Sequence, residues 1–266
     1  MDRQTHPFQW TPASITRFWS KYESSPGMEL WHFARQRGKA LMQYVQKRIS
    51  IREPVLDFGC GSGYLLDILV QMGLKCFGAD VNTEAIDLLN RRLAGQSGFL
   101  GARTVGSEQK IPFEDNSAGS VFLLETVEHL LPDSISPLFS EIRRVLKQDG
   151  VLVITTPYRE NLGLSMIACE SCKAVFHKTQ HIGSLDEISM SDMVEKAGFS
   201  RLSCSGALLL PDWKVWIKAQ RSPARISVAC PECGNACSSP NSSMFLRWKS
   251  LMKELRHLVC IVKKIK

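Results

Sequence analysis

The stretch VLDFGCGSGYLL, residues 55–66, constrains the fold of this chain more than any other part of it. Apolar residues on both sides of Asp57 indicate a short buried strand, and the apolar pattern that resumes after the glycines indicates a helix. Between them, Gly59, Gly61 and Gly63 alternate with small residues. Glycine permits positive φ and a close approach of backbone to a ligand, while the first turn of a helix offers unpaired N–H groups. The stretch therefore predicts a strand, a ligand-binding turn and a helix in succession.

A second apolar run, GLKCFGAD, ends in Asp80, seventeen residues after Gly63. A dinucleotide site is the alternative, but its G-x-G-x-x-G fingerprint needs glycine at the sixth place, where this chain has Tyr64. An acid before the glycines, a G-x-G-x-G turn and an acid that closes the second strand resemble the first two strands of class I S-adenosylmethionine (SAM) methyltransferases. The resemblance implies SAM as the methyl donor.

The resemblance also implies which residues meet SAM. The glycines would pass close to its methionine part, Asp57 would order the turn or meet the amino group, and Asp80 would take both ribose hydroxyls. Many relatives carry an acid at the position of Ser107, so the serine leaves the adenine to backbone groups. The full set of implied cofactor-binding residues is Asp57, Gly59, Gly61, Gly63, Asp80, Val81, Ser107, Glu108 and Glu125.

Further helix and strand patterns follow in the order of that family. They are a helix over Asn82–Leu93, a strand near Ala102–Val105, a strand before Glu125, a helix over Leu138–Leu146, the strand VLVITTP, a helix over 185–197 and the strand FSRLSCSGALLL. We therefore expect an α/β fold, with a doubly wound, Rossmann-like, seven-stranded sheet. Residues 225–229 are one candidate for its antiparallel seventh strand.

Three domains are expected. Residues 1–50 form an N-terminal helical cap that closes over the donor site, and residues 51–229 form the core, with a Cys/His insertion at 161–184. Residues 230–266 hold a second cysteine pair and a C-terminal helix. Because no run of about 18 apolar residues and no signal-peptide core occur, a cytoplasmic protein is expected.

The net charge of +7 is concentrated at the end of the chain. Residues 244–266 contain seven Lys and Arg against the single acid Glu254. Apolar residues recur there at spacings of three and four, which predicts an amphipathic helix with a basic face. Such a helix suits peripheral contact with an anionic inner-membrane surface or self-association. The rest of the chain is nearly neutral and lacks an RNA-binding motif, so nucleic acid is not an expected partner.

The segment ETVEH, residues 125–129, lies where the fourth strand should end and where open α/β sheets bind ligands. Its spacing resembles the divalent-metal motif of ubiquinone-biosynthesis O-methyltransferases and of small-RNA terminal 2′-O-methyltransferases. That resemblance implies Mg²⁺ or another divalent ion at Glu125, Glu128, His129 and His181. The preferred interpretation is a metal-free site in which Glu128 and His129 are the catalytic pair and His129 faces the acceptor.

Two C-x-x-C pairs predict a metal site, because four thiolates suit the closed tetrahedral coordination of structural zinc. The favoured ligands are Cys169, Cys172, Cys230 and Cys233. If residues 225–229 were the seventh strand, the two pairs would lie at opposite edges of the sheet. Zinc would then be bound locally, by Cys169, Cys172, His177 and His181. Reduced thiols without metal are the third interpretation. The pairs also resemble those of a bacterial methyltransferase subgroup with a CxxC insertion after strand five.

The expected function is methyl transfer from SAM to an oxygen of a small-molecule, sugar or lipid-linked acceptor. Methylation of RNA or protein is the alternative within enzymes. A non-catalytic adaptor that docks through its cysteine knuckles is the alternative outside them, and the complete glycine turn with Asp80 argues against it.

Overall fold

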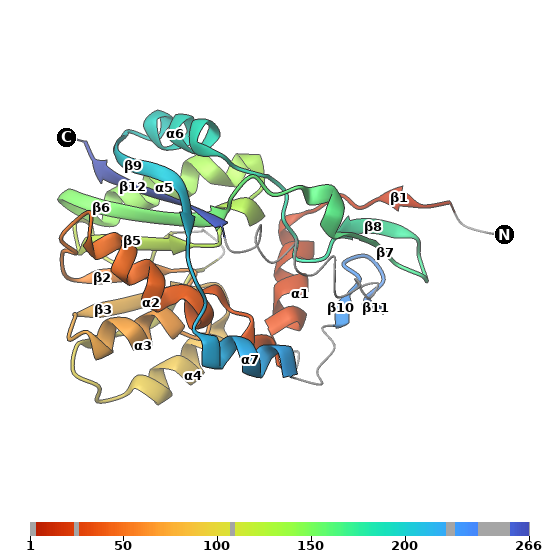
Figure 1. The fold of residues 1–266 in the computed structure, drawn as a ribbon, viewed down its shortest axis with the longest axis horizontal. Helices are drawn as coiled ribbons and strands as arrows, with labels where there is room; N and C mark the ends of the chain where they lie inside the picture. Colours follow the sequence, from red (N-terminus) through yellow and green to blue (C-terminus); the bar gives the residue numbers. More distant parts are fainter. Residues whose placement is uncertain (1–3, 24–26, 107–109, 222–226, 239–255, 266) are drawn as a thin grey trace.

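A seven-stranded sheet forms the centre of the molecule (Figure 1). The computed structural model describes residues 4–23, 27–106, 110–221, 227–238 and 256–265. The strands lie in the order β4-β3-β2-β5-β6-β12-β9. Their bounds are β2 Val55–Phe58, β3 Cys76–Asp80, β4 Phe99–Thr104, β5 Ala118–Leu124, β6 Leu146–Pro157, β9 Phe199–Leu208 and β12 Arg256–Lys264. Only β12 is antiparallel to its neighbours in this sheet of described residues. The predicted Rossmann-like class is confirmed.

Helices cover both faces of the sheet (Figure 1). Packed on one face are α2 Phe33–Gln46, α3 Tyr64–Gln71 and α4 Thr83–Leu93, and on the other α5 Pro132–Val145 and α6 Glu187–Lys196. Side chains of β5 alternate between the two cores: Phe122 packs with the first group, and Val121 and Leu123 pack with the second. Burial on both faces is the reason these strands are continuously apolar in sequence. Helix α5 begins at Pro132, earlier than the predicted Leu138, because proline is well suited to the first helical turn.

The predicted C-terminal helix over 244–266 is wrong for the part of it that the structure describes. Residues Arg256–Lys264 form β12, which pairs with β6 on one side and β9 on the other. Val259 and Ile261 face one core, while the residues between and beside them face the other. A helix would have exposed part of the continuous apolar run LVCIV, whereas a central strand buries all of it. Residues 244–255 lie outside the described residues, so the proposed membrane or self-association helix loses its C-terminal half.

The assignment of residues 225–229 to the seventh strand is also wrong. Ser227–Ala229 form β10, which pairs with β11 Ala236–Ser238 in a separate two-stranded sheet, and residues 225–226 are not described. The core sheet therefore does not end at residue 229, because the chain returns to it with β12. The objection that the two cysteine pairs lie at opposite edges of the sheet is removed with this assignment.

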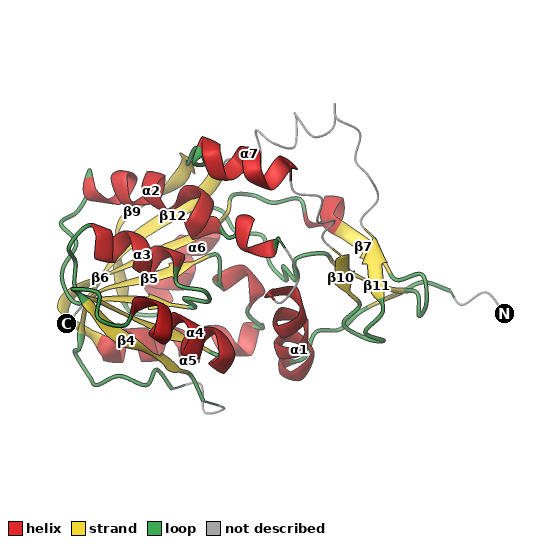
Figure 2. Cartoon of the chain, turned by 90° about the horizontal axis from the view of Figure 1, so that it is seen from below, coloured by secondary structure: helices red, strands yellow, loops and turns green. Residues whose placement is uncertain are grey.

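A smaller unit lies beside the main sheet, at the right of Figures 1 and 2. Strands β1 His6–Pro7, β8 Ala174–His177 and β7 Met166–Ala168 form a three-stranded sheet, and β10 with β11 forms the second. Helix α1 Pro12–Glu23 packs against β10. These elements share an apolar cluster of Phe18, Ile167, Cys169, Cys172, Ala174, Phe176, Val228, Cys230 and Cys237. We call this unit the cysteine module.

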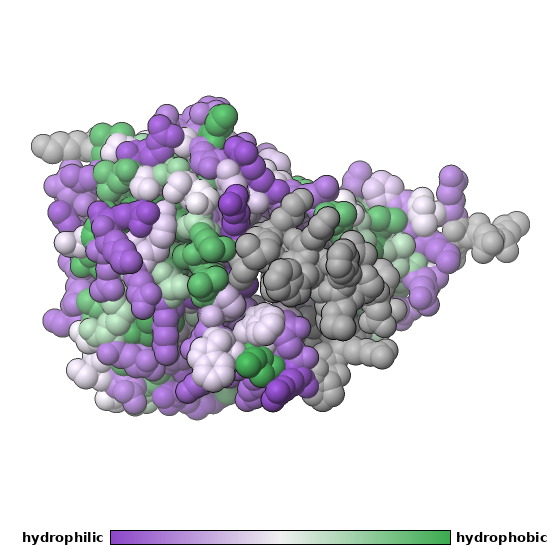
Figure 3. Space-filling model, in the orientation of Figure 1, coloured by the Kyte–Doolittle hydropathy of each residue, from purple (hydrophilic) through white to green (hydrophobic). Residues whose placement is uncertain are grey.

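Short elements connect the two parts. They are the 3-10 helices η1 Met28–Leu30 and η3 Leu162–Ser165, and helix α7 Trp213–Arg221, which contacts α2 and η1. A further 3-10 helix, η2 Val127–His129, lies between β5 and α5 within the larger part. Among the described residues, no helix is both long and apolar enough to cross a bilayer. Hydrophilic residues predominate on the face in Figure 3, with hydrophobic ones in separate spots.

Candidate active site

The glycine turn joins β2 to α3 in the predicted way. Gly59, Gly61 and Gly63 have φ of 77°, 46° and 77°, in the left-handed region that favours glycine. A Cβ at Gly63 would lie 2.3 Å from Cδ1 of Leu89, so a larger residue does not fit there. Gly63 is also the N-cap of α3 and brings no side-chain cap, which leaves the first N–H groups of the helix available to a ligand.

Asp80 connects this turn to the end of β3. Its Oδ2 accepts a hydrogen bond from the Gly61 N–H at 2.8 Å, and its Oδ1 accepts one from the Asn82 N–H at 2.9 Å. Burial raises the pKa of Asp80, and the backbone donors act in the opposite direction. The next residue, Val81, is 63% exposed and offers an apolar surface beside the carboxylate. A carboxylate and an apolar surface in this position suit a ribose and a flat ring.

Asp57 lies on β2 below the glycine turn and is only 3% exposed. Burial and the nearby charge of Asp80 raise its pKa to about 8. A ligand that brings positive charge into this region would therefore stabilise the ionised carboxylate. Ser107 and Glu108, the other residues expected near the adenine, lie outside the described residues.

The segment ETVEH stands next to the glycine turn. A Cβ at Gly59 would lie 3.1 Å from Oγ1 of Thr126, so the two segments are in close contact. Glu125 has a φ of 46°, and its Oε2 lies 3.5 Å from Nε2 of His257 on β12. Burial raises the pKa of Glu125 to about 8. Glu125 thus faces His257, which was not among the predicted site residues.

Glu128 and His129 follow on η2 and meet three residues from elsewhere in the chain. We call the set Glu128, His129, Glu160, His177 and His181 the polar cluster. Nε2 of His129 lies 3.9 Å from Oε1 of Glu128, and the rings of His129 and His181 are 4.9 Å apart. Neither carboxylate oxygen of Glu128 makes a hydrogen bond of ordinary geometry among the described residues. A buried carboxyl in this state suits a ligand or a proton.

His129 is enclosed by the cap and by the loop after β8. The Trp19 ring of α1 lies 4.7 Å from the His129 ring, and the Trp19 Nε1–H donates to Oε1 of Gln180 at 2.7 Å. Nδ1 of His129 faces the Gln180 carbonyl at 3.4 Å. Burial and the charge of His181 lower the pKa of His129 to about 3. His129 is therefore neutral near pH 7, with Nε2 available as an acceptor.

Three of the four residues expected around a divalent ion come together. One ligand atom from each of Glu128, His129 and His181 lies within 4.8 Å of the others. Glu125 is not part of this group. A carboxyl and two imidazoles are a chemically suitable donor set for a divalent ion.

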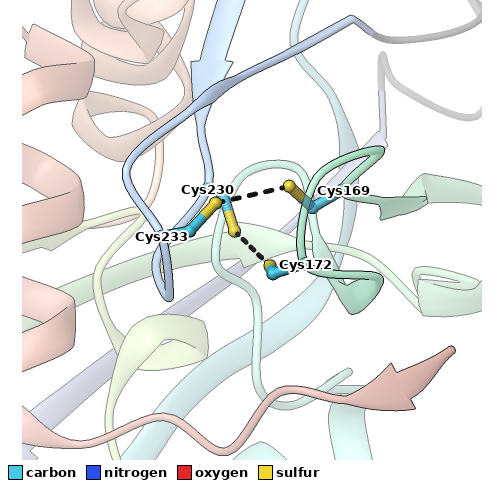
Figure 4. Close-up of side chains that lie close together, drawn as sticks. All are labelled: Cys169, Cys172, Cys230 and Cys233. Atoms are coloured by element: carbon cyan, nitrogen blue, oxygen red, sulfur yellow. Dashed lines mark hydrogen bonds between the residues drawn. The ribbon is translucent and has the colours of Figure 1, made fainter. Parts of the chain in front are cut away.

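Four cysteines converge in the cysteine module (Figure 4). Sγ of Cys169 lies 3.6 Å from Sγ of Cys233, and Sγ of Cys172 lies 3.5 Å from Sγ of Cys230. These spacings exclude disulfides, and four sulfurs about 2.3 Å from a tetrahedral zinc ion lie about 3.8 Å apart. The donor set therefore fits zinc. His177 and His181, the local alternative ligands, face Glu160 instead.

Backbone hydrogen bonds also lower the pKa of Cys169 to about 6, although burial alone would raise it. These bonds come from the N–H groups of Ser171 and Cys172. Hydrogen bonds donated to the sulfur stabilise its thiolate form, which is the form that binds metal. Cys237 lies in the same apolar cluster but is not one of the four converging cysteines.

Sequence reasoning missed Glu160, Gln180 and His257. Glu160 follows β6 by three residues, at the ligand-binding edge of the sheet, and that position was the one available signal. His257 stood inside a segment predicted as a helix.

Comparison with known proteins agrees with this geometry. Residues 56–154 match the family model described as a methyltransferase domain. The chain is 25% identical over 174 residues to a probable S-adenosylmethionine-dependent methyltransferase of Mycolicibacterium smegmatis, covering 65% of this chain and 62% of that protein. It is 30% identical over 122 residues to a ubiquinone biosynthesis O-methyltransferase of Actinobacillus pleuropneumoniae, covering 43% and 51%. The chain thus spans about half to three fifths of the length of these relatives.

Two solved structures show the likeness of the whole fold. Geranyl diphosphate C-methyltransferase of Streptomyces coelicolor has a TM-score of 0.60 at 13% identity, covering 97% of this chain and 100% of that one. A putative methyltransferase in complex with the Trm112 activator of Haloferax volcanii has a TM-score of 0.60 at 17% identity, covering 97% and 100%. Residues 56–154 therefore match a methyltransferase domain, in a chain that shares the fold of solved methyltransferase structures.

Proposed function

We propose that this protein transfers the methyl group of SAM to an oxygen of a small-molecule, sugar or lipid-linked acceptor. The observation that carries the proposal is the hydrogen bond from Gly61 to Asp80, which sets a carboxylate against the glycine turn directly beside ETVEH. A donor site and a polar cluster thus adjoin at the carboxyl edge of the sheet, where such folds bind ligands.

Each part of the donor site has a chemical task. The turn brings backbone amides close to the ligand, Asp80 would bind the ribose hydroxyls, and Asp57 would meet the cationic amino group. The raised pKa of Asp57 supports this task, because a cation nearby would favour the ionised carboxylate. The amide at Gly61 already holds Asp80 in place, so little reordering is needed when the ligand binds.

SAM supplies an electrophilic methyl group, and the protein has to align an acceptor oxygen with it. In an oxygen transfer, the C–S bond breaks as the C–O bond forms, and the acceptor loses a proton. His129 is neutral and would take this proton on Nε2. Because burial disfavours its imidazolium and raises the pKa of Glu128, this step needs Glu128, 3.9 Å away, in its ionised form. Trp19 covers the histidine and would exclude water from it.

A divalent ion at Glu128, His129 and His181 is the alternative state of the same site. The observation in its favour is that both Glu128 oxygens lack a hydrogen bond of ordinary geometry among the described residues. These residues would hold the ion, and the ion would supply Lewis acidity that lowers the pKa of an acceptor hydroxyl. Glu125 would not be a ligand, since it faces His257.

We further propose that Cys169, Cys172, Cys230 and Cys233 bind structural zinc. The sulfur spacing supports this, as does the position of the cluster, which joins two segments far apart in sequence within one small apolar core. Small units of this size commonly need a metal or a disulfide for stability. A zinc ion would thereby fix the cysteine module, including α1, beside the active site.

The function is tested with methyl-labelled SAM and separated cell fractions of metabolites, lipids, RNA and proteins. We expect label in the metabolite or lipid fraction. Label in RNA or protein would correct the acceptor class. If no fraction acquires label while SAM binds, the protein is an adaptor with the methyltransferase fold.

A further inference from the structure

Glu160 connects two histidines of the polar cluster. It lies in the turn between β6 and η3, and its side chain is about one fifth exposed. Its Oε2 is hydrogen-bonded to Nδ1 of His181, and its Oε1 lies 3.5 Å from Nε2 of His177. Each carboxylate oxygen therefore faces a different imidazole.

The backbone determines where His177 carries its proton. Nδ1 of His177 accepts a hydrogen bond from the His181 N–H at 3.1 Å, and the Thr179 N–H points at the same nitrogen at 3.4 Å. A nitrogen that accepts hydrogen bonds has no proton, so neutral His177 carries its proton on Nε2. This nitrogen lies 3.5 Å from Oε1 of Glu160, without a hydrogen bond of ordinary geometry among the described residues. His177 therefore offers no lone pair on Nε2 to a metal ion, although Glu160, His177 and His181 lie close enough to suggest a site.

The same reasoning gives the opposite result for His181. A glutamate in its ordinary ionised form only accepts hydrogen bonds, so neutral His181 donates from Nδ1 to Glu160 and its lone pair is on Nε2.

We infer that Glu160 is a positioning residue that fixes the tautomer of His181, so that the Nε2 lone pair of His181 is directed to Glu128 and His129. This inference rests on the proposed function, in which Glu128, His129 and His181 face the acceptor or bind a metal ion. Carboxylates commonly orient histidines in this way, and their loss typically costs about 10–100-fold in affinity or activity.

The arrangement also joins the cysteine module to the active site. His177 is the last residue of β8, and β8 begins two residues after Cys172. His177 is 2% exposed and stacks on His181, with 4.6 Å between ring centroids and 20° between planes. The short strand β8 thus connects the cysteine cluster to His177, the ring on which His181 stacks.

The test is nitrogen NMR of the full-length chain labelled with ¹⁵N-histidine, with signals assigned through His177→Gln and His181→Gln. We expect His181 protonated on Nδ1 and His177 protonated on Nε2. In Glu160→Gln, only one of the two oxygens that face His177 and His181 remains an acceptor, and the amide NH₂ that replaces the other is a donor. We therefore expect His181 to shift toward the tautomer with its proton on Nε2. Glu160→Asp keeps the charge and should retain more of the original state. The matched control is Glu170→Gln, an exposed acid of the same module.

Activity gives a second measurement. With any acceptor that takes label, Glu160→Gln should lower kcat by about 10–100-fold and leave the SAM affinity unchanged. The inference is overturned if wild-type His181 carries its proton on Nε2, or if Glu160→Gln leaves both tautomers unchanged. The tautomers do not depend on turnover, so predicted tautomers in a protein without methyl transfer would instead overturn the proposed function.

Discussion

The N–H of Gly61 donates to Oδ2 of Asp80 over 2.8 Å, and this bond joins the turn after β2 to the end of β3. It orders the donor site before any ligand binds. The same turn touches Thr126 through Gly59, so donor and acceptor chemistry share one edge of the sheet.

The C-terminal strand should contribute to stability as a central element. Ile261 is fully buried in β12, so Ile261→Ala should lower the free energy of unfolding by about 2–5 kcal/mol. Ile265 is the control, because it is 48% exposed, and Ile265→Ala should cost less than about 0.5 kcal/mol. Urea unfolding measures both. Equal, small effects would mean that the tail does not lie in the sheet.

Asp57 should make stability depend on pH. Its ordinary pKa is 3.8 and its pKa in the folded chain is about 8, so between these values the folded chain holds a proton that the unfolded chain has lost. Unfolding therefore releases this proton, and stability falls as pH rises, by at most about 1.4 kcal/mol per pH unit. Asp57→Asn should be less sensitive over this window in denaturant titrations. An identical pH dependence of both proteins would contradict the assignment.

Zinc binding should depend on four cysteines that come from two segments. We expect about one zinc ion per wild-type chain by elemental analysis, and a loss of it in Cys230→Ser together with a lower Tm. Cys237→Ser is the matched control, since Cys237 is buried in the same cluster but is not among the four. Unchanged zinc content in Cys230→Ser would reject the four-cysteine site.

His129 should act in the transfer step and not in donor binding. His129→Ala should lower kcat by about 10²–10⁴-fold with little change in the SAM Kd. His6→Ala, an exposed histidine of the cysteine module, is the control. Full turnover in His129→Ala on the true acceptor would remove it from the mechanism. Glu128→Gln distinguishes the alternative state, because only a metal-dependent enzyme would then need far more Mg²⁺ or Mn²⁺.

Local patterns predicted the parts of the fold in which neighbours in sequence decide the structure. The glycine turn, the order of strands up to β6 and the amphipathic helices carry their own signals. The tail was mispredicted because spacings of three and four over 244–266 competed with the apolar run LVCIV, and only pairing with β6 and β9 decides between them. Long-range pairing is not visible in one sequence.

The residues of the candidate site also fall into those that a local sequence pattern identifies and those that depend on a distant partner. Asp57 and Asp80 could be named because the glycine turn and the two strands around it resemble a known family, and the four cysteines because each pair is a local motif. Glu160 and His257 could not, since each acquires its meaning from a partner far away in the chain, His181 and Glu125 respectively. A single acid after a strand is too common to stand out.

The most direct test of the account is a calorimetric titration of SAM into the wild-type chain and into Asp80→Ala, with Asp87→Asn as control. Asp87 is an exposed acid of α4, near Asp80 in sequence but away from the turn. We predict one SAM bound per chain for the wild type and the control, and at least about tenfold weaker binding for Asp80→Ala, because hydrogen bonds to a charged acceptor are each worth about 1.5–3 kcal/mol. Absence of SAM binding to the wild type, or equal affinity in Asp80→Ala, would contradict the donor site.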